Sequence, residues 1–450
     1  MIENTQVIIN KSKSRSENKD FNFSKDQIRI TSSEVINSYR DKAWESFSKT
    51  FIPTIKDDPW RRTDLRMLKV DRFELATSND STKKDTIPSN LLKPLADGEH
   101  GGQILISGND VRSYLDPALE GQGVIFTDLL TAELKYPQLV EKIIGKIVEP
   151  SEGKFAAMTG ALAQNGVFLY VPKNITIESP LHSLIWGSTI DFANTTHVMV
   201  YLEGGASVTY VHEVASDTET NGQSLQSSNI EMYVGPGSSL RFVELQSWGR
   251  HVWNFTHERV NVDRNGSVDW IFGAIGGHLT KNFAELNLIA DGASGKMSGF
   301  YFTDQDQHLD YDSQQNHLAP HTTSDLLFKG ALVEKSRSVW QGMIYVAPGA
   351  DKTDGYQANR NLLLSRDARA DSIPGLEILA DDVRCTHGAT VGKIDADQIF
   401  YLMARGIPRL EAERLIVEGF FDPIMQRIPF EGVRERFQQS ITDKMKAYTG

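Results

Sequence analysis

The sequence predicts a mainly β protein whose core is a β-solenoid, preceded by a mixed, partly helical region and followed by a helical region. Short apolar or alternating runs fill the middle of the 450-residue chain, and Gly-rich corners separate them about every thirty residues. Apolar residues at three- and four-residue intervals mark helices near both ends. We expect a disordered tail over residues 1–24, a mixed N-terminal domain over 25–152, the solenoid over 153–394 and a helical C-terminal domain over 395–450.

The N-terminal part begins with a tail rich in Asn, Lys, Ser and Asp, which buries too little apolar surface to offset the entropy of ordering. It has acidic residues and no apolar stretch, so it does not read as a targeting segment. An amphipathic helix is expected from Ser33, ending before Pro53. Short strands are expected at 103–107 and 123–126, and largely helical structure at 129–148. The apolar positions that define the first helix are Val35, Ile36, Tyr39, Ala43, Trp44 and Phe47.

The predicted solenoid strands are short runs enriched in Val, Ile, Leu and aromatic residues. Each corner between them is Gly-rich and introduces a new strand, which favours stacked coils. A β-sandwich also shows regularly spaced strands, but a sandwich of roughly 100 residues would have to be repeated to absorb this region. The expected strands lie at 167–171, 197–202, 207–212, 230–234, 240–244, 268–272 and 284–289, with corners at 203–207, 235–238, 263–267 and 291–294.

After Ile394 the periodicity becomes helical again. Asp395 is a good N-cap with Gln398 three residues on, and Gly406 stands where a left-handed C-cap belongs. A second helix is expected after Pro408. Two short helices in this position either close the open edge of the solenoid or present a docking face, and the edge-closing role is the default.

Composition excludes several classes of protein. The formal charge of −12 argues against binding to nucleic acid or to an anionic membrane surface, because phosphate binding needs clustered Lys and Arg. No apolar run approaches the length that crosses a bilayer. One cysteine in the whole chain excludes an intrachain disulfide framework and fits a reducing cytoplasm, which is the expected location.

The most informative segment places the only cysteine two positions before a histidine. On a β-strand, Cys385 and His387 would point to the same face, bringing a soft sulfur and an imidazole nitrogen side by side. Alternation would put Arg384 on the opposite face. A lone cysteine is more often a small buried hydrophobe than a ligand. Any metal or cluster held here would need further ligands from elsewhere or from a second protein.

Sequence resemblance favours the ligand interpretation. The stretch Asp381-Asp-Val-Arg-Cys-Thr-His-Gly-Ala-Thr-Val-Gly-Lys-Ile-Asp395, followed by Gln398-Ile-Phe-Tyr-Leu402 and Arg405-Gly-Ile407, resembles the C-terminal signature of the SufD-like branch of the SufB/SufD family. The resemblance is sparser at residues 57–66 and 153–173. The first of these holds Asp58-Pro-Trp-Arg-Arg-Thr-Asp-Leu65, in which Thr63 and Asp64 are expected simply to cap a turn.

The resemblance implies a right-handed parallel β-helix core and a scaffold role, without catalysis, in iron–sulfur cluster assembly. It implies pairing with a SufB-like subunit through the β-helix, in a SufBCD complex where a SufC-type ATPase hydrolyses ATP. Cys385 and His387 would serve a shared site for a transient cluster or iron. Flavin binding, the sulfur donor and self-association in isolation stay open. The ATPase would dock on residues 395–427, where the candidate contacts are Phe400, Tyr401, Arg405, Gly406 and Phe420.

One position separates this chain from the SufB-like branch. Arg360 stands where SufB-like chains carry their cluster-building cysteine, and an arginine cannot ligate iron. Nucleotide-binding chemistry is also missing: Gly388-Ala-Thr-Val-Gly-Lys393 is one residue too short for a phosphate loop and is followed by Ile394 instead of Ser or Thr.

The competing interpretation is a carbohydrate-active β-helix, either a lyase or a hydrolase. Its carboxylates would come from an acidic segment that is expected to be a solvated polar loop. The residues of this segment are Asp304, Asp306, His308, Asp310 and Asp312.

Overall fold

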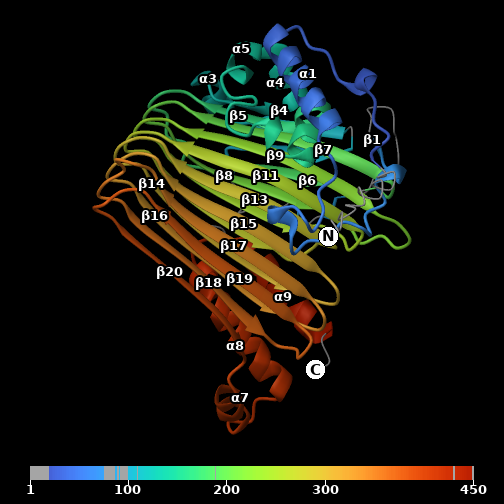
Figure 1. Cartoon of the computed structure of the whole chain (residues 1–450), viewed down its shortest axis with the longest axis vertical. Helices are drawn as coiled ribbons and strands as arrows, with labels where there is room; N and C mark the ends of the chain where they lie inside the picture. Colours follow the sequence, from blue (N-terminus) through green and yellow to red (C-terminus); the bar gives the residue numbers. More distant parts are fainter. Residues whose placement is uncertain are drawn as a thin grey trace, which may run out of the picture.

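The computed structural model describes residues 20–75, 87–88, 91, 100–108, 110–187, 189–428 and 431–447. Two sheets of mainly parallel strands face each other across a central lumen, and helices of the N-terminal and C-terminal regions lie outside the sheets (Figure 1). Successive strands alternate between the sheets, so the chain winds as a β-solenoid. This confirms the predicted mainly β class and the parallel solenoid core.

Sheet A has the strand order β19-β17-β15-β13-β11-β9-β7-β5-β4, with β1 also paired to β7. All its pairs are parallel except β4 with β5. Its strands are β1 (Glu74–Leu75), β4 (Ile125–Asp128), β5 (Asn165–Val171), β7 (Phe192–Leu202), β9 (Ser224–Val234), β11 (Val252–Val262), β13 (Leu279–Leu288), β15 (His308–His317), β17 (Arg337–Val346) and β19 (Arg369–Ile378).

Sheet B has the order β20-β18-β16-β14-β12-β10-β8-β6-β2-β3 and is parallel except for β2 with β3. Strand β2 belongs to sheet B and strand β4 to sheet A. Both sheets therefore begin before residue 153, within the segment that the sequence assigned to the N-terminal domain. The strands of sheet B are β2 (Gly102–Ser107), β3 (Asp110–Leu115), β6 (Leu181–Trp186), β8 (Ser207–Ala215), β10 (Ser239–Ser247), β12 (Ser267–Ala274), β14 (Ser294–Thr303), β16 (Thr323–Leu332), β18 (Asp354–Leu363) and β20 (Arg384–Lys393).

The Gly-rich corners repeat one backbone conformation. Gly205, Gly237, Asn265 and Gly292 occupy equivalent corner positions, and each has a positive φ between 54° and 74°. Only Gly, Asn and a few other residues adopt this left-handed conformation at low cost. The repeated Gly and Asn therefore set the corners at which the chain passes from sheet A to sheet B.

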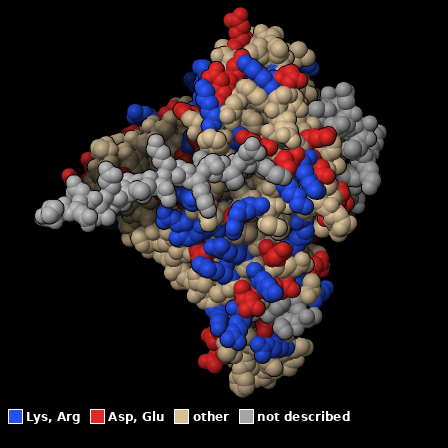
Figure 2. Space-filling view, turned by 45° about the vertical axis from the view of Figure 1, so that its right-hand side comes forward, with Lys and Arg blue, Asp and Glu red and all other residues tan. Residues whose placement is uncertain are grey.

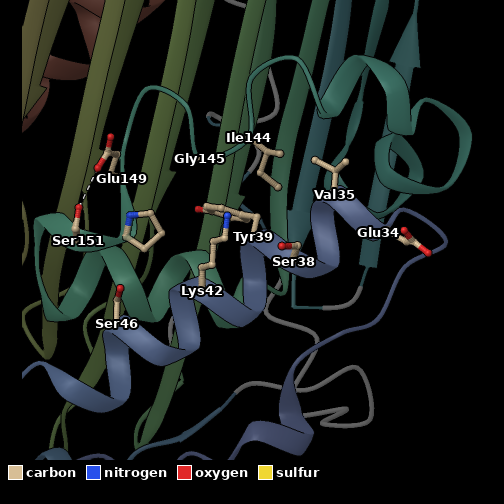
Figure 3. A pocket seen from close by; sticks show the side chains of 11 residues that line it. Glu34, Val35, Ser38, Tyr39, Lys42, Ser46, Ile144, Gly145, Glu149 and Ser151 are labelled. Atoms are coloured by element: carbon tan, nitrogen blue, oxygen red, sulfur yellow. Dashed lines mark hydrogen bonds between the residues drawn. The ribbon is translucent and has the colours of Figure 1, made fainter.

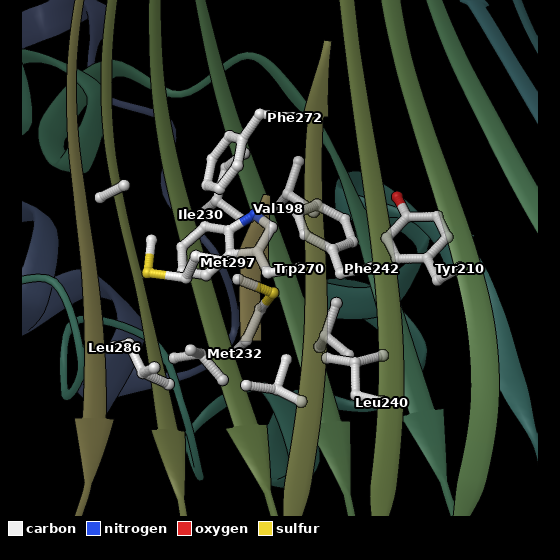
Figure 4. Packing of buried hydrophobic residues seen from close by; sticks show 14 of the residues in the cluster. Val198, Tyr210, Ile230, Met232, Leu240, Phe242, Trp270, Phe272, Leu286 and Met297 are labelled. Atoms are coloured by element: carbon white, nitrogen blue, oxygen red, sulfur yellow. The ribbon is translucent and has the colours of Figure 1, made fainter. Parts of the chain in front are cut away.

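Apolar side chains fill much of the lumen, and they come from both sheets. Figure 4 shows this packing around Trp270, Phe242 and Met232, which point inward from strands of opposite sheets. Successive inward positions stack on equivalent positions of the coils above and below, as in the column Tyr210, Phe242 and Trp270. The stacking buries each apolar row against the next and forms one continuous core.

The N-terminal helices cover the outer face of sheet A. The amphipathic helix α1 (Glu34–Lys49) begins at Ser33, whose side chain accepts a hydrogen bond from the Ile36 amide, as the sequence predicted. It packs against α6 (Lys154–Leu162) and, through Phe47 and Phe155, against Phe255 of β11. The other helices of this region are α3 (Pro117–Gly121), α4 (Leu129–Lys135) and α5 (Pro137–Val140), so the helical expectation for 129–148 fails beyond Val140.

The tail expected to reach Ser24 is ordered in its last residues. Phe21 is buried and contacts Phe47, Phe73 and Phe155, and Asp20 pairs with Lys154 at 2.8 Å. The average composition of residues 1–24 is polar, so it did not reveal that a single phenylalanine, Phe21, holds the end of this segment in the core. The rest of the expected disordered tail lies outside the described residues.

The two longer C-terminal helices lie on the outer face of sheet B, and the short helix before them packs on the first of these. Among the described residues, most of the last strand stays exposed. The helices of this region are α7 (Ala396–Met403), α8 (Arg409–Met425) and α9 (Glu431–Ala447), and the sequence reading missed the last as a separate helix. Phe421 and Phe437 pack against Phe300 of β14. The edge-closing role expected for these helices is therefore wrong, because their apolar faces match the apolar outer rows of β10 to β16. No described helix is long and apolar enough to span a bilayer.

Exposed charges are mixed in sign on the face shown in Figure 2. Lys and Arg side chains predominate in the middle of this face, with Asp and Glu among them. Several ion pairs join the last helix to sheet B, including Lys444 with Asp304 at 2.6 Å and Arg436 with Glu213 at 2.5 Å. These pairs fix α9 on the sheet in addition to its apolar contacts.

Two carboxyl groups meet inside the lumen. Glu244 of β10 and Glu258 of β11 are both buried there and influence each other's pKa, and Asn282 donates to Glu258 at 2.6 Å. Burial raises the pKa of Glu244, and burial together with the charge of Glu244 raises the pKa of Glu258 well above its usual value. A proton shared by the pair limits the cost of two buried negative charges.

We expect Glu258→Gln to stabilise the chain, increasingly so at higher pH. Because the folded pKa of Glu258 lies above its unfolded value, the wild-type chain loses stability as pH rises above about 4.5. Glutamine keeps the acceptor for Asn282 and carries no charge, so the gain should be about 1 kcal/mol or more at neutral pH. Urea unfolding between pH 5 and 9 measures it, with the exposed Glu178→Gln as control. If the free energy of unfolding changes with pH equally in the wild type, Glu258→Gln and Glu178→Gln, the raised pKa of Glu258 is contradicted.

Candidate functional site

The Cys385 and His387 pair lies on β20, the terminal strand of sheet B. In the ladder with β18, Cys385 stands opposite Gly355 and His387 opposite Gln357. Gln357 is buried in the lumen, so the alternation of the strand places both predicted ligands on the lumen side. Arg384 is exposed and lies on the other side, as the alternation predicted.

Cys385 packs inward but remains accessible. It contacts a small apolar cluster built from Ile344, Val346 and Ala350, with Val383 alongside. Burial is the main cause that raises the pKa of its thiol. The side chain is only half-buried, and His387 two residues later is exposed, because no further coil covers them.

The terminal coil forms an open end of the solenoid. Strands β19 and β20 each have a neighbour on one side only, so one edge of each carries no partner strand among the described residues. Apolar side chains surround this edge, and Leu379 and Val391 are 51% and 45% exposed. An unpaired edge with exposed apolar residues is a surface on which another strand can pair. The pair Cys385 and His387 lies within this surface.

A second imidazole stands behind Cys385 in the lumen. His317, on β15, is fully buried, and burial lowers its pKa to about 4. Its Nε2 atom and the Sγ atom of Cys385 lie 3.3 and 3.2 Å from the point where a Cβ on Gly355 would stand. Sequence reasoning missed His317 because the two residues are 68 positions apart. The register of sheet B leads from Cys385 to Gly355 and Ser324, whereas His317 belongs to sheet A, so only the tertiary structure brings it near Cys385.

The described residues contain no group of three or more His, Cys, Asp or Glu side chains placed to hold a metal ion. Cys385 and His387 therefore offer two donors, a soft sulfur and a nitrogen, at an edge where another chain could add more. Arg360 faces away from them: it is exposed on the outer side of β18, in register with Thr390.

The C-terminal helices expose part of the predicted docking set. Asp395 caps α7 by accepting from the Asp397 amide, and Gly406 ends the segment with a φ of 89°. Phe400 and Tyr401 are 73% and 57% exposed, and the Arg405 guanidinium lies 4.7 Å from the Tyr401 ring. Of the predicted residues, Phe400 and Tyr401 are exposed on α7, and Arg405 and Gly406 are exposed in the turn that follows it.

Phe420 does not share that surface. It is partly buried against Phe421, and the Lys329 ammonium lies 4.8 Å from its ring. Between α7 and α8 there is a shallow apolar hollow of about 430 Å³, lined by Tyr401, Leu402 and Ile416 among others. The geometry favours α7 and this hollow as the accessible part of the region.

The acidic segment proposed for carbohydrate chemistry is an exposed turn at Asp306, as expected, but from His308 onward it is strand β15 and not a loop. Asp310 is fully buried on the outer side of β15, where Lys281 lies 3.0 Å from it and the Thr63 hydroxyl donates to it. Asp304 is paired with Arg250 and contributes to the anchor of α9. These carboxylates bind structural partners and do not converge on one cleft.

The same contacts revise the expected role of Thr63. Asp64 accepts from the Arg66 amide at 3.0 Å and caps the turn as predicted, but Thr63 reaches across to sheet A. Trp60, from the same segment, packs on Phe255 and Phe283. The Asp58–Leu65 motif therefore fastens the N-terminal region to the solenoid.

A groove of about 610 Å³ lies beside α1. Figure 3 shows Tyr39 and Ile144 at its floor, with Lys42, Glu34 and Glu149 around its rim. None of the residues that the sequence singled out for metal or ATPase binding lines it. We therefore place the candidate site at the open end of the solenoid.

Comparison with known proteins identifies the family of the chain. Residues 185–420 match the family described as the SUF system FeS cluster assembly, SufBD core domain, and residues 13–182 match the SufBD protein N-terminal region. The chain therefore belongs to the SufBD family of iron–sulfur cluster assembly proteins. The two matched regions meet just before β6 ends, within the early coils of the solenoid.

Within this family the chain is similar to SufD. It is 31% identical over 392 residues to the iron–sulfur cluster assembly protein SufD of Bacillus subtilis (strain 168), which covers 86% of this chain and 88% of the relative. It is 30% identical over 320 residues to an iron–sulfur cluster assembly SufBD family protein of Staphylococcus aureus (strain USA300), covering 70% and 68% of the two chains. The family assignment and the SufD-like branch predicted from residues 381–407 are thus confirmed.

We expect the Cys385 thiol to react slowly with iodoacetamide in the folded chain. Its rate should rise at a higher pH than in urea-unfolded chain, because burial raises the pKa of the folded thiol. Mass spectrometry between about pH 7 and 10 gives an unambiguous rate, since the chain has one cysteine. Complete protection of Cys385 from iodoacetamide would contradict its exposure at the open end. Equal rates of modification in the folded and unfolded chains would contradict its partial burial.

Proposed function

We propose that the chain is a scaffold subunit of a SufBCD-type complex for iron–sulfur cluster assembly. In this role it pairs with a SufB-like subunit through the open end of the solenoid and binds a SufC-type ATPase through α7 and α8. Cys385 and His387 contribute donors to an assembly site that the partner completes. Iron and sulfur are the cargo of this site, and ATP hydrolysis belongs to the partner.

The observation that carries the proposal is the position of Cys385 and His387 on an unpaired terminal strand. A partner strand added to β19 or β20 would cover the exposed apolar residues and satisfy the free backbone groups of the edge. It would also bring its own side chains next to the sulfur and the imidazole. Two donors suit a transient site better than a closed structural one, because the remaining positions stay available to the partner and the cargo.

The ATPase contact is supported by the exposed aromatic surface of α7. Phe400 and Tyr401 project from a capped helix beside an apolar hollow, and aromatic residues next to a pocket are typical anchors of protein interfaces. The following helix α8 packs through Phe421 on β14, so a movement of this region would be transmitted to sheet B. Through this contact, closure of the ATPase on nucleotide would move α8 and so displace the strands of sheet B.

We expect His387→Ala to leave the complex assembled but unable to build clusters. His387 is exposed and opposite Gln357, so its loss removes a donor without opening the core. Co-purification with SufB-like and ATPase subunits measures assembly, and the visible absorption of reconstituted clusters measures function. Thr386→Ala, on the opposite side of the same strand, is the control. Joint loss of assembly and cluster formation would instead indicate a packing role.

We expect the double variant Phe400→Ala, Tyr401→Ala to weaken ATPase binding by about 2 kcal/mol or more, because exposed aromatic anchors dominate such interfaces. Pairing with the SufB-like subunit should persist, since α7 packs on α8 and takes no part in the strand ladder of β20. Calorimetric titration of the isolated chain with the ATPase measures the change. Met67→Ala removes an equally exposed apolar side chain from the N-terminal region and is the matched control. Unchanged affinity in the double variant would contradict this docking surface.

A further inference from the structure

Lys329 of β16 differs from the other buried lysines of the described chain, because no carboxylate pairs with it. The other two, Lys154 and Lys281, lie 2.8 and 3.0 Å from carboxylate oxygens. The Lys329 ammonium instead donates to the Phe420 carbonyl of α8 at 2.6 Å and lies 4.8 Å from the ring of the same residue. A buried ammonium without a carboxylate beside it carries an uncompensated positive charge, which favours an anion at that place.

Arg360 brings a second positive charge to the same place. It stands next to Lys329 in the register of sheet B, one strand nearer the open end. Burial lowers the pKa of the Lys329 ammonium, and the charge of Arg360 lowers it further, so the two cations act on each other. The carboxylate of Asp422 opposes this shift in part, but in the described structure it accepts a hydrogen bond from Gln426 and forms no ion pair with either cation. Like charges side by side cost free energy, and an anion bound to both would remove that cost.

The two cations stand where the helical cover of sheet B ends. Helix α8 packs on β14 and β16, and its Phe420 contacts Lys329. Arg360 on β18 and Thr390 on β20 continue the same row beyond the helix, and both are exposed on the outer side of the sheet. The row therefore offers two cations and a hydroxyl donor beside α8, on a part of the outer face that stays accessible.

We propose that Lys329, Arg360 and Thr390 form a docking site for an acidic side chain of the ATPase that binds α7 and α8. The inference rests on the proposed function for the identity of the partner, and it adds a charged contact to the aromatic one on α7. Position favours this partner, because the site adjoins α8 and extends the docking surface onto the sheet. Charge favours a carboxylate, because a chain with a formal charge of −12 repels acidic segments over most of its surface and attracts them where cations are unpaired.

Calorimetric titration of the full-length chain with the SufC-type ATPase, from low to high KCl concentration, tests the proposal. Arg360→Gln should weaken binding about tenfold at low salt and reduce its salt dependence, because it removes one charge from the contact. Lys329→Met should act in the same direction, whereas Arg360→Lys keeps the charge and should bind nearly as the wild type. Arg384→Gln is the matched control, since it removes the same charge from an exposed arginine at the first residue of β20. Thermal unfolding establishes that each variant is folded.

The outcomes separate the inference from the proposed function. Equal ATPase affinity in Arg360→Gln and Arg384→Gln would overturn the charged site, while the aromatic surface of α7 would keep its own test. A loss confined to Lys329→Met would indicate a displaced α8 and would overturn the site as well. If the wild-type chain does not bind the ATPase, the inference fails together with the proposed docking.

Inorganic phosphate is the probe for a different source of the anion. Phosphate binding that Arg360→Gln abolishes, together with unchanged ATPase affinity in the same variant, would overturn the acidic partner in favour of a free anion. A tenfold loss of ATPase affinity in Arg360→Gln without detectable phosphate binding would support the acidic side chain.

Discussion

The structure depends on hydrogen bonding between adjacent coils. Each strand obtains its backbone partners from the coil before and the coil after it, so only the terminal coils have unsatisfied edges. At the N-terminal end the antiparallel strands β3 and β4 finish the two sheets. At the other end β19 and β20 stop without such strands. The single cysteine stands at this second end, where the solenoid is incomplete.

The helical segments stabilise the solenoid from its two outer faces. The contacts of Trp60 and Phe155 with Phe255 attach the N-terminal region to sheet A. The hydrogen bond from Thr63 to Asp310, which is itself paired with the buried Lys281, adds to this attachment. The last helix is attached to sheet B by Phe437 and by Lys444, whose pKa burial lowers to about 8. Because these contacts cover faces and not ends, they strengthen the coils while leaving the terminal edge available. A buried ion pair of this kind specifies position more than it adds stability.

The lumen combines apolar packing with polar groups at particular levels. Glu244 and Glu258 meet near its middle, and His317 with Gln315 lies close to its open end. Buried polar groups must be paired or protonated, so their cost is offset only by specific partners. The His317 ring is held in this way by the hydroxyls of Thr322 and Ser324. The polar interior thus extends to the level of the candidate site.

The sequence by itself determined the solenoid, because corner glycines and strand periodicity are local features. It also determined that Cys385 and His387 share one face of a strand, and the resemblance around them determined the family. Only the tertiary structure decided that α8 and α9 cover a face of sheet B, that Asp310 is buried against Lys281 and that His317 stands behind Cys385. These contacts join residues far apart in the chain, and they depend on the register in which coils stack. The pattern of apolar residues within one segment does not specify which residues of the neighbouring coils that segment will face.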